Sequence, residues 1–124
     1  MAFLALAGYA LDAAFADAVA ALAKRHPADD FVQVLHAEAI MDTQPWDYWE
    51  AAGAKPKGRA GDLLAALEKV LARNPGHTGA IHLYIHAVEA STKPERALPH
   101  AVHAGYELSQ DAFAVFVLGA IAFA

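Results

Sequence analysis

The stretch VLARNPGHTGAIHLYIHAVEAS, residues 70–91, holds the end of one helical segment, a turn and the whole of the next segment. Asn74 and Pro75 mark the turn, because proline lacks the N–H that continues a helix. Over residues 76–91 the apolar residues recur at helical spacing, so they would form one side of a helix that packs against its neighbours. These apolar residues are Ile81, Tyr84, Ile85 and Val88.

Helical spacing of the larger residues recurs along the 124-residue chain, which predicts an all-α fold in a single domain over residues 1–124. No β-sheet is expected. An aspartate N-cap is expected in the connection 27–30, and Pro99 is expected to kink or delay the last helix. The expected helices span residues 2–9, 12–25, 31–41, 61–73 and 76–91, with a last one after Pro94.

Two of these helices carry stripes of large apolar residues that we expect to be buried. In the helix 12–25 the stripe is Phe15, Val19 and Leu22, and in the helix 61–73 it is Leu63, Leu64, Leu67, Val70 and Leu71. Two segments lack the helical pattern. Residues 45–58, PWDYWEAAGAKPKG, contain two prolines and two glycines and predict an irregular loop whose aromatic residues fold back onto the helices. The tail 105–124 is divergent and apolar, and its last part, DAFAVFVLGAIAFA, residues 111–124, is apolar on every side.

The composition excludes several classes of function. The formal net charge of −5, without a run of Lys or Arg, argues against a nucleic-acid partner. The absence of cysteine excludes disulfides, a thiolate nucleophile and sulfur-ligated zinc. The first apolar segment meets Asp12 after about ten residues, too few for a membrane span, and it lacks the basic region of a signal peptide. We therefore expect a cytoplasmic protein, although a longer parent protein could be exported.

Three polar residues of the helix 76–91 share one face. His82, His86 and Glu89 are spaced i, i+4 and i+7. Imidazoles one turn apart can both bind one divalent ion such as Zn, Cu or Ni, and Glu89 could be a ligand or a general base. The alternative is that these side chains bind a peptide carboxylate or hydrogen-bond to neighbouring helices. Additional metal ligands could come from His77, His100 and His103.

Two segments of the chain repeat one another. ALAKRHPADD, residues 21–30, and VLARNPGHTG, residues 70–79, both place a basic and a polar residue before a proline and a short connection. Pro27 and Pro75 lie 48 residues apart, and 34 residues remain once the 14-residue loop 45–58 is left out. That is the period of the tetratricopeptide repeat.

The pattern Leu67, Val70, Leu71, Pro75, Tyr84, Ala97 and Ala104 resembles the hydrophobic pattern of that repeat. The segments MDTQPWDYWE, VLARNPGHTGAIHLYIHAVEAS and PERALP resemble a group of bacterial tetratricopeptide-repeat proteins of unassigned biochemistry, over residues 15–101, and the tail departs from that group. The resemblance implies antiparallel helix pairs in a short array of about six helices. It also implies that the first helix of each pair lines a concave groove, with His82, His86 and Glu89 on one helix and Glu38 and Met41 one repeat earlier.

Aromatic residues of the loop 45–58 are expected beside this groove, as a wall made of Trp46, Tyr48 and Trp49. The favoured function is a helical-repeat binding module that presents the His/Glu-bearing groove to a peptide or protein partner. The alternative is a small metal-dependent enzyme, a hydrolase with Glu89 and His86 as catalytic residues. The apolar tail predicts a homodimer or higher oligomer whose interface includes residues 112–124.

Overall fold

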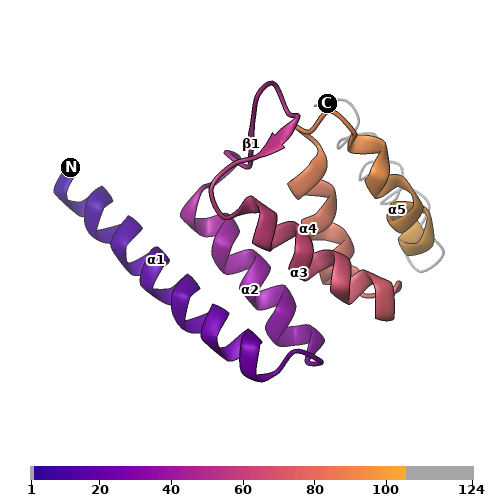
Figure 1. Ribbon diagram of the computed structural model, residues 1–124, viewed down its shortest axis with the longest axis horizontal. Coiled ribbons are helices and arrows are strands. Elements are labelled where there is room, and N and C mark those ends of the chain that lie inside the picture. Colours follow the sequence, from indigo (N-terminus) through magenta and orange to yellow (C-terminus); the bar gives the residue numbers. More distant parts are fainter. Residues whose placement is uncertain (1, 106–124) are drawn as a thin grey trace.

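The computed structural model describes residues 2–105. Consecutive helices run back and forth beside one another, and a small hairpin stands at one end of them (Figure 1). In chain order the elements are α1 (Ala2–Arg25), α2 (Asp30–Thr43), β1 (Trp49–Glu50), β2 (Lys55–Pro56), α3 (Ala60–Arg73), α4 (Thr78–Val88), the 3₁₀-helix η1 (Pro94–Ala97) and α5 (Leu98–Gly105). The described part of the chain is therefore mostly helical, as predicted.

The predicted helices 2–9 and 12–25 form a single helix, α1. α1 runs without a break from Ala2 to Arg25, so the predicted boundary near residues 9–12 is wrong and residues 2–105 contain five α-helices. The physical reason is that this stretch has no proline, and a single glycine such as Gly8 costs a helix only about 1 kcal/mol. The last helix begins at Leu98, so Pro99 lies in its first turn, where a missing N–H does no harm.

The prediction of no sheet is also wrong. Within the predicted loop, β1 pairs with β2 in antiparallel register, with Trp49 opposite Pro56 and Glu50 opposite Lys55. The turn between them uses positive φ at three consecutive residues, Ala51, Ala52 and Gly53, with values of 52°, 54° and 88°. Glycine adopts such values freely, so Gly53 lets the chain reverse within a few residues.

The hairpin is attached to the C-terminal end of α4. The indole Nε1 of Trp49 donates a hydrogen bond of 2.7 Å to the carbonyl oxygen of Ala87. The backbone N–H of Thr92 donates to the carbonyl oxygen of Gly53 at 2.9 Å. These two contacts fix the connection between α2 and α3 against α4, which is more than thirty residues away along the chain.

The main core lies between α2, α3 and α4. The whole stripe predicted for the helix 61–73 is buried in α3, and the apolar side predicted for the helix 76–91 is buried in α4. The largest fully buried side chains are Ile40, Leu63, Leu67, Val70, Ile81 and Val88. The helical periodicity was therefore sufficient to predict which sides of α3 and α4 face inward.

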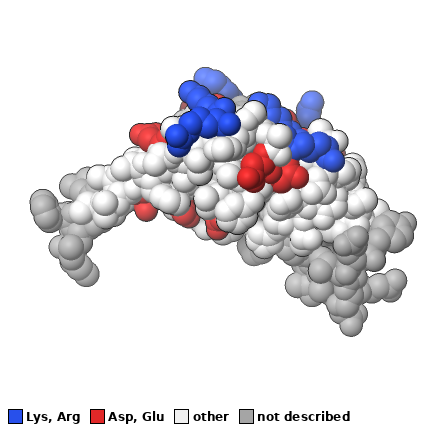
Figure 2. All heavy atoms as spheres, turned by 90° about the horizontal axis from the view of Figure 1, so that it is seen from below, with Lys and Arg blue, Asp and Glu red and all other residues white. Residues whose placement is uncertain are grey.

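α1 packs differently from the other helices. Its buried stripe consists of Ala16, Val19 and Ala23, which lie against α2, while Phe15 is 51 % exposed, so the predicted stripe was wrong at Phe15. Alanine lets two helix backbones approach closely, and the small side chains of α1 therefore decide which side faces α2. The N-terminal half of α1 extends beyond α2 (Figure 1), and Figure 2 shows the Lys and Arg side chains of this face gathered along one edge of the molecule.

The turn between α1 and α2 is held by polar contacts on both sides. Asp29 is the N-cap of α2 and accepts from the N–H of Val32 at 3.1 Å, as predicted for this connection. From the end of α3, Arg73 donates to the Asp30 carboxylate and to the Pro27 carbonyl. The hydrogen bond from Arg73 holds the pKa of Asp30 below its usual range. The turns that carry the two repeated prolines are thus neighbours in space.

No helix within residues 2–105 combines the length and the apolar character that crossing a bilayer requires. The apolar tail from which self-association was predicted, residues 112–124, lies outside the described residues.

We predict that Gly53→Ala destabilises the fold by about 1–3 kcal/mol. The residue has positive φ, and an added Cβ would lie 2.6 Å from the carbonyl oxygen of Ala90. Gly61→Ala is the matched control, because a Cβ at Gly61 meets nothing within 4 Å and alanine favours a helix by up to about 1 kcal/mol. Urea unfolding followed by circular dichroism measures both variants. Equal stability of the two would contradict the close packing of the hairpin on α4.

Candidate functional site

A hollow of about 310 Å³ opens between α2, the start of the hairpin connection and α4. We call it the groove. It combines carboxylates, imidazoles and aromatic rings. Its lining residues are Glu38, Met41, Asp42, Pro45, Trp46, Tyr48, His82, Leu83 and His86. The structure therefore brings together six residues that the sequence placed on one groove: Glu38, Met41, Trp46, Tyr48, His82 and His86.

Three rings stand edge to face along this groove. The centroid of Trp46 lies 5.4 Å from that of His86 at an interplanar angle of 88°, and His86 lies 4.8 Å from His82 at 72°. Aromatic pairs prefer this arrangement because the positive edge of one ring meets the negative face of the other. The side chain of Trp46 is thereby positioned over the end of α4 that carries His86.

Trp46 is exposed and its backbone is unusual. Its exposed fraction is 69 %, and its φ is 61°, in the left-handed region that bulky residues rarely adopt. Such conformations cost about 1–3 kcal/mol and tend to occur at functional sites. The turn is closed behind it by the N–H of Asp47, which donates to the carbonyl of Gln44 at 3.0 Å, and by Gln44 Nε2, which donates to the Asp47 carbonyl. The turn thus holds the large aromatic ring of Trp46 exposed to solvent.

The other two predicted wall residues are buried or half-buried. Tyr48 lines the base of the groove and is 6 % exposed, and burial raises the pKa of its hydroxyl. Trp49 does not line the groove, because its indole is turned toward α4 and bonded to the carbonyl of Ala87. Of the three predicted wall residues, Trp49 therefore supports the wall from behind, and Trp46 forms its surface.

The groove has an acidic character. Glu38 and Asp42 stand one turn apart on α2, and among the described residues no Lys or Arg lines the groove. Partial burial lowers the pKa of His82, and the neighbouring His86 lowers it further. The His82 ring is therefore neutral at pH 7 and does not cancel the carboxylate charge. The groove offers two carboxylates, two imidazoles and an indole face to a ligand.

Glu89 lies at the end of the predicted histidine stripe. It follows the last residue of α4 as its C-cap, and its Oε1 is 3.4 Å from Nδ1 of His86. Its side chain is only 12 % exposed. Within residues 2–105, no three His, Asp or Glu side chains are gathered as a metal ion would need. His82, His86 and Glu89 are therefore neighbours, but their side chains do not converge on one point.

The additional histidines are elsewhere. His77 is the N-cap of α4, at the opposite end from Glu89, and its Nδ1 accepts from the N–H of Ala80 at 3.2 Å. His100 packs edge-on against Tyr84, with 5.3 Å between ring centroids, on the buried side of α4. His103 lies beside Gly76. The structure thus does not bring His77, His100 and His103 to the groove, because α5 packs on the side of α4 away from His82.

Three lining residues were not singled out from the sequence: Asp42, Pro45 and Leu83. Asp42 could have been found, since it follows Glu38 by one helical turn. Pro45 precedes Trp46 directly, but nothing in the sequence predicts the turn that brings both to α4.

No family model matches the chain, and no curated protein or solved structure matches it.

Proposed function

We propose that the chain is a helical-repeat binding module of the tetratricopeptide type that takes up a segment of a partner protein in the groove. The support is the agreement between the repeat pattern and the position of the groove. The repeated segments 21–30 and 70–79 precede α2 and α4 respectively, so the same position in each repeat begins a groove-lining helix. A repeat array uses such equivalent helices to build one continuous binding surface.

The observation that carries the proposal is the exposed Trp46 beside the hollow. Tryptophan is enriched among the residues that dominate binding energy at protein interfaces, because it buries a large area with few rotatable bonds. Here the ring is already held in place by its turn and by contact with His86. A ligand that covers it therefore gains apolar contact with little loss of side-chain freedom.

The groove chemistry selects the kind of segment. A hollow of about 310 Å³ has room for one or two side chains rather than a folded domain. The carboxylates of Glu38 and Asp42 attract a Lys or Arg side chain, and the indole of Trp46 offers a cation–π surface to the same group. The proposed ligand is thus a peptide segment with a basic residue that enters between α2 and the Trp46 turn.

Selection of random peptides displayed on phage against the immobilised protein tests this function. We expect enriched peptides to carry Lys or Arg, and we expect Trp46→Ala to weaken their binding at least about tenfold, as for an interface hot spot. Glu38→Gln/Asp42→Asn is expected to weaken basic peptides selectively. Fluorescence polarisation of labelled peptides measures the affinities.

Phe31→Ala is the matched control for Trp46, because Phe31 is 73 % exposed and does not line the groove. The proposal predicts that this control binds the selected peptides like the unchanged protein. Failure to enrich any peptide, or equal weakening by Phe31→Ala and Trp46→Ala, would rule out the groove as the binding surface.

A second candidate function is metal-dependent hydrolysis at His82, His86 and Glu89. The observation that favours it is the proximity of the two imidazoles, 4.8 Å between ring centroids, with Glu89 next to His86. A rotation of the His82 side chain to another staggered rotamer would let both rings reach one ion. Glu89 would then be a third ligand or the base that activates a bound water.

Calorimetric titration with zinc, copper and nickel at neutral pH tests the second candidate. It predicts one saturable site per chain that disappears in His82→Ala/His86→Ala. His100→Ala/His103→Ala removes the same number of imidazoles away from the groove and is expected to retain the site. A titration without saturable binding, or with the same binding in both double variants, excludes metal chemistry at these residues.

A further inference from the structure

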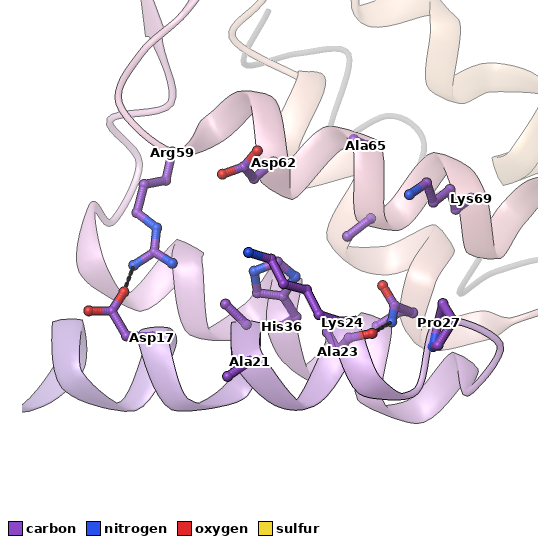
Figure 3. Close-up of a pocket in the computed structure, with 13 residues that line it drawn as sticks. Asp17, Ala21, Ala23, Lys24, Pro27, His36, Arg59, Asp62, Ala65 and Lys69 are labelled. Carbon is purple, nitrogen blue, oxygen red and sulfur yellow. Dashed lines mark hydrogen bonds and ion pairs between the residues drawn. The ribbon is translucent and has the colours of Figure 1, made fainter.

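A second and larger hollow, of about 650 Å³, lies between α1 and α3 with α2 as its floor (Figure 3). We call it the α1–α3 hollow. It shares no lining residue with the groove. Its volume is within the range of pockets that hold small organic molecules, which is roughly 300–1,000 Å³. The proposed peptide function makes no use of it.

The hollow exists because small side chains face one another across it. Ala21 of α1 stands opposite Ala65 of α3 in Figure 3, and Ala20 and Ala66 also line the hollow. Methyl groups cannot fill the space between two helices that both rest on α2, so an apolar-walled gap remains. The walls are therefore suited to the hydrocarbon part of a ligand.

The floor of the hollow is polar, and the side-chain amide of its buried Gln33 already has hydrogen-bond partners within the protein. Gln33 is buried at 6 % exposure, and its Nε2 donates to the carbonyls of Ala23 and His26 at 3.0 and 3.2 Å. His36 lies beside it on α2. Burial lowers the pKa of His36, and the positive charge of Arg59 lowers it further. The imidazole is thus neutral at pH 7 and provides a hydrogen-bonding group rather than a charge.

Three cationic and two acidic side chains line the hollow. Arg59 is paired with Asp17 at 3.0 Å across the hollow. Lys24 and Lys69 also line it, and among the described residues neither has an ion-pair partner. In Figure 3 the Lys69 side chain lies along α3, and Lys24 extends from α1 over His36 on the side of Asp62. The remaining acidic residue of the lining is Asp62, on the α3 side of the hollow near Arg59.

With Arg59 paired to Asp17, the lining keeps Lys24 and Lys69 against Asp62, an excess of one positive charge in a chain whose formal net charge is −5. Lys24 and Lys69 stand on facing helices, and each offers an ammonium group without an ion-pair partner that attracts an anion. An extended polyanion would meet Asp17 and Asp62 as well. The charge pattern therefore suits a compact anion.

We propose that the α1–α3 hollow binds a small organic anion, with its hydrocarbon body on the facing alanines and its carboxylate or phosphate between the ammonium groups of Lys24 and Lys69. The imidazole of His36 supplies a hydrogen bond from below. This anion site shares no residue with the groove, so its presence does not depend on whether the groove binds a peptide.

Phenyl phosphate is the probe, because it joins an aromatic body to a compact anion. Titration at low salt, followed by ¹H–¹⁵N NMR, is expected to give saturable shifts confined to α1, α2 and α3. Inorganic phosphate, which lacks the body, and benzyl alcohol, which lacks the charge, are each expected to bind at least about tenfold more weakly. Equal affinity for inorganic phosphate would reduce the site to non-specific ion attraction and overturn the proposal.

Two sets of variants test separately the charge of the lysines and the open volume of the hollow. Lys24→Gln/Lys69→Gln is expected to weaken phenyl phosphate at least about tenfold, while Lys55→Gln/Lys93→Gln makes the same change in net charge away from the hollow and is expected to stay within twofold. Ala65→Phe fills the hollow and is expected to abolish binding. Its control is Ala72→Phe, another exposed alanine of α3 that does not line the hollow.

Circular dichroism melting shows that each variant is folded before it is titrated. Unchanged binding in Lys24→Gln/Lys69→Gln or in Ala65→Phe, or an equal loss in the matched controls, contradicts the proposal. No saturable shift with phenyl phosphate contradicts it as well.

Discussion

The hydrogen bond from the Trp49 indole to the carbonyl of Ala87 decides where the groove is. The last carbonyls of any helix lack partners within that helix, and a buried one left unpaired costs about 1–3 kcal/mol. Trp49 satisfies one such carbonyl of α4 and thereby fixes the hairpin beside it. Because Trp46 precedes Trp49 by only three residues, its ring is then brought against His86. A contact that stabilises the fold thus also builds the wall of the candidate site.

The orientation of α4 about its own axis is fixed from behind by a polar cluster. The Tyr84 hydroxyl donates to Glu68 of α3 at 3.0 Å and accepts from Arg96 Nε of η1 at 2.9 Å, and Arg96 also pairs with Glu68. Burial and the carboxylate of Glu68 raise the pKa of Tyr84. With Tyr84 held between two other elements, α4 cannot rotate. His82 and His86, on its opposite side, must therefore face α2 and the Trp46 turn.

Helical periodicity predicted much of this arrangement. The predicted apolar stripes of α3 and α4 are buried because large apolar residues decide which side of those helices faces the core. Helical periodicity also predicted that His82 and His86, four residues apart, share one face of α4. The resemblance to tetratricopeptide repeats implied that Glu38 would share their groove, and the structure places it there. Whether that groove binds a peptide stays a prediction.

The sequence did not predict features that depend on contacts between distant segments. Strands of two residues have no alternating pattern to recognise, and the hairpin forms because Gly53 and Trp49 meet the end of α4. The side of α1 that faces α2 was mistaken at Phe15, because a close approach of backbones through alanine outweighed the burial of a larger ring. The α1–α3 hollow was missed for a related reason, since no pattern of alanine and lysine in one helix shows what lies opposite.

Hydrogen exchange at the two indole N–H groups, followed by NMR, tests most directly whether the hairpin is fixed on α4 while Trp46 stays free at the groove. Trp46→Phe assigns the two signals. The Trp49 indole proton, which is bonded to Ala87, is predicted to exchange orders of magnitude more slowly than that of the exposed Trp46. Equally fast exchange of both protons would show that the hairpin is not held on α4 and that the groove has no fixed wall.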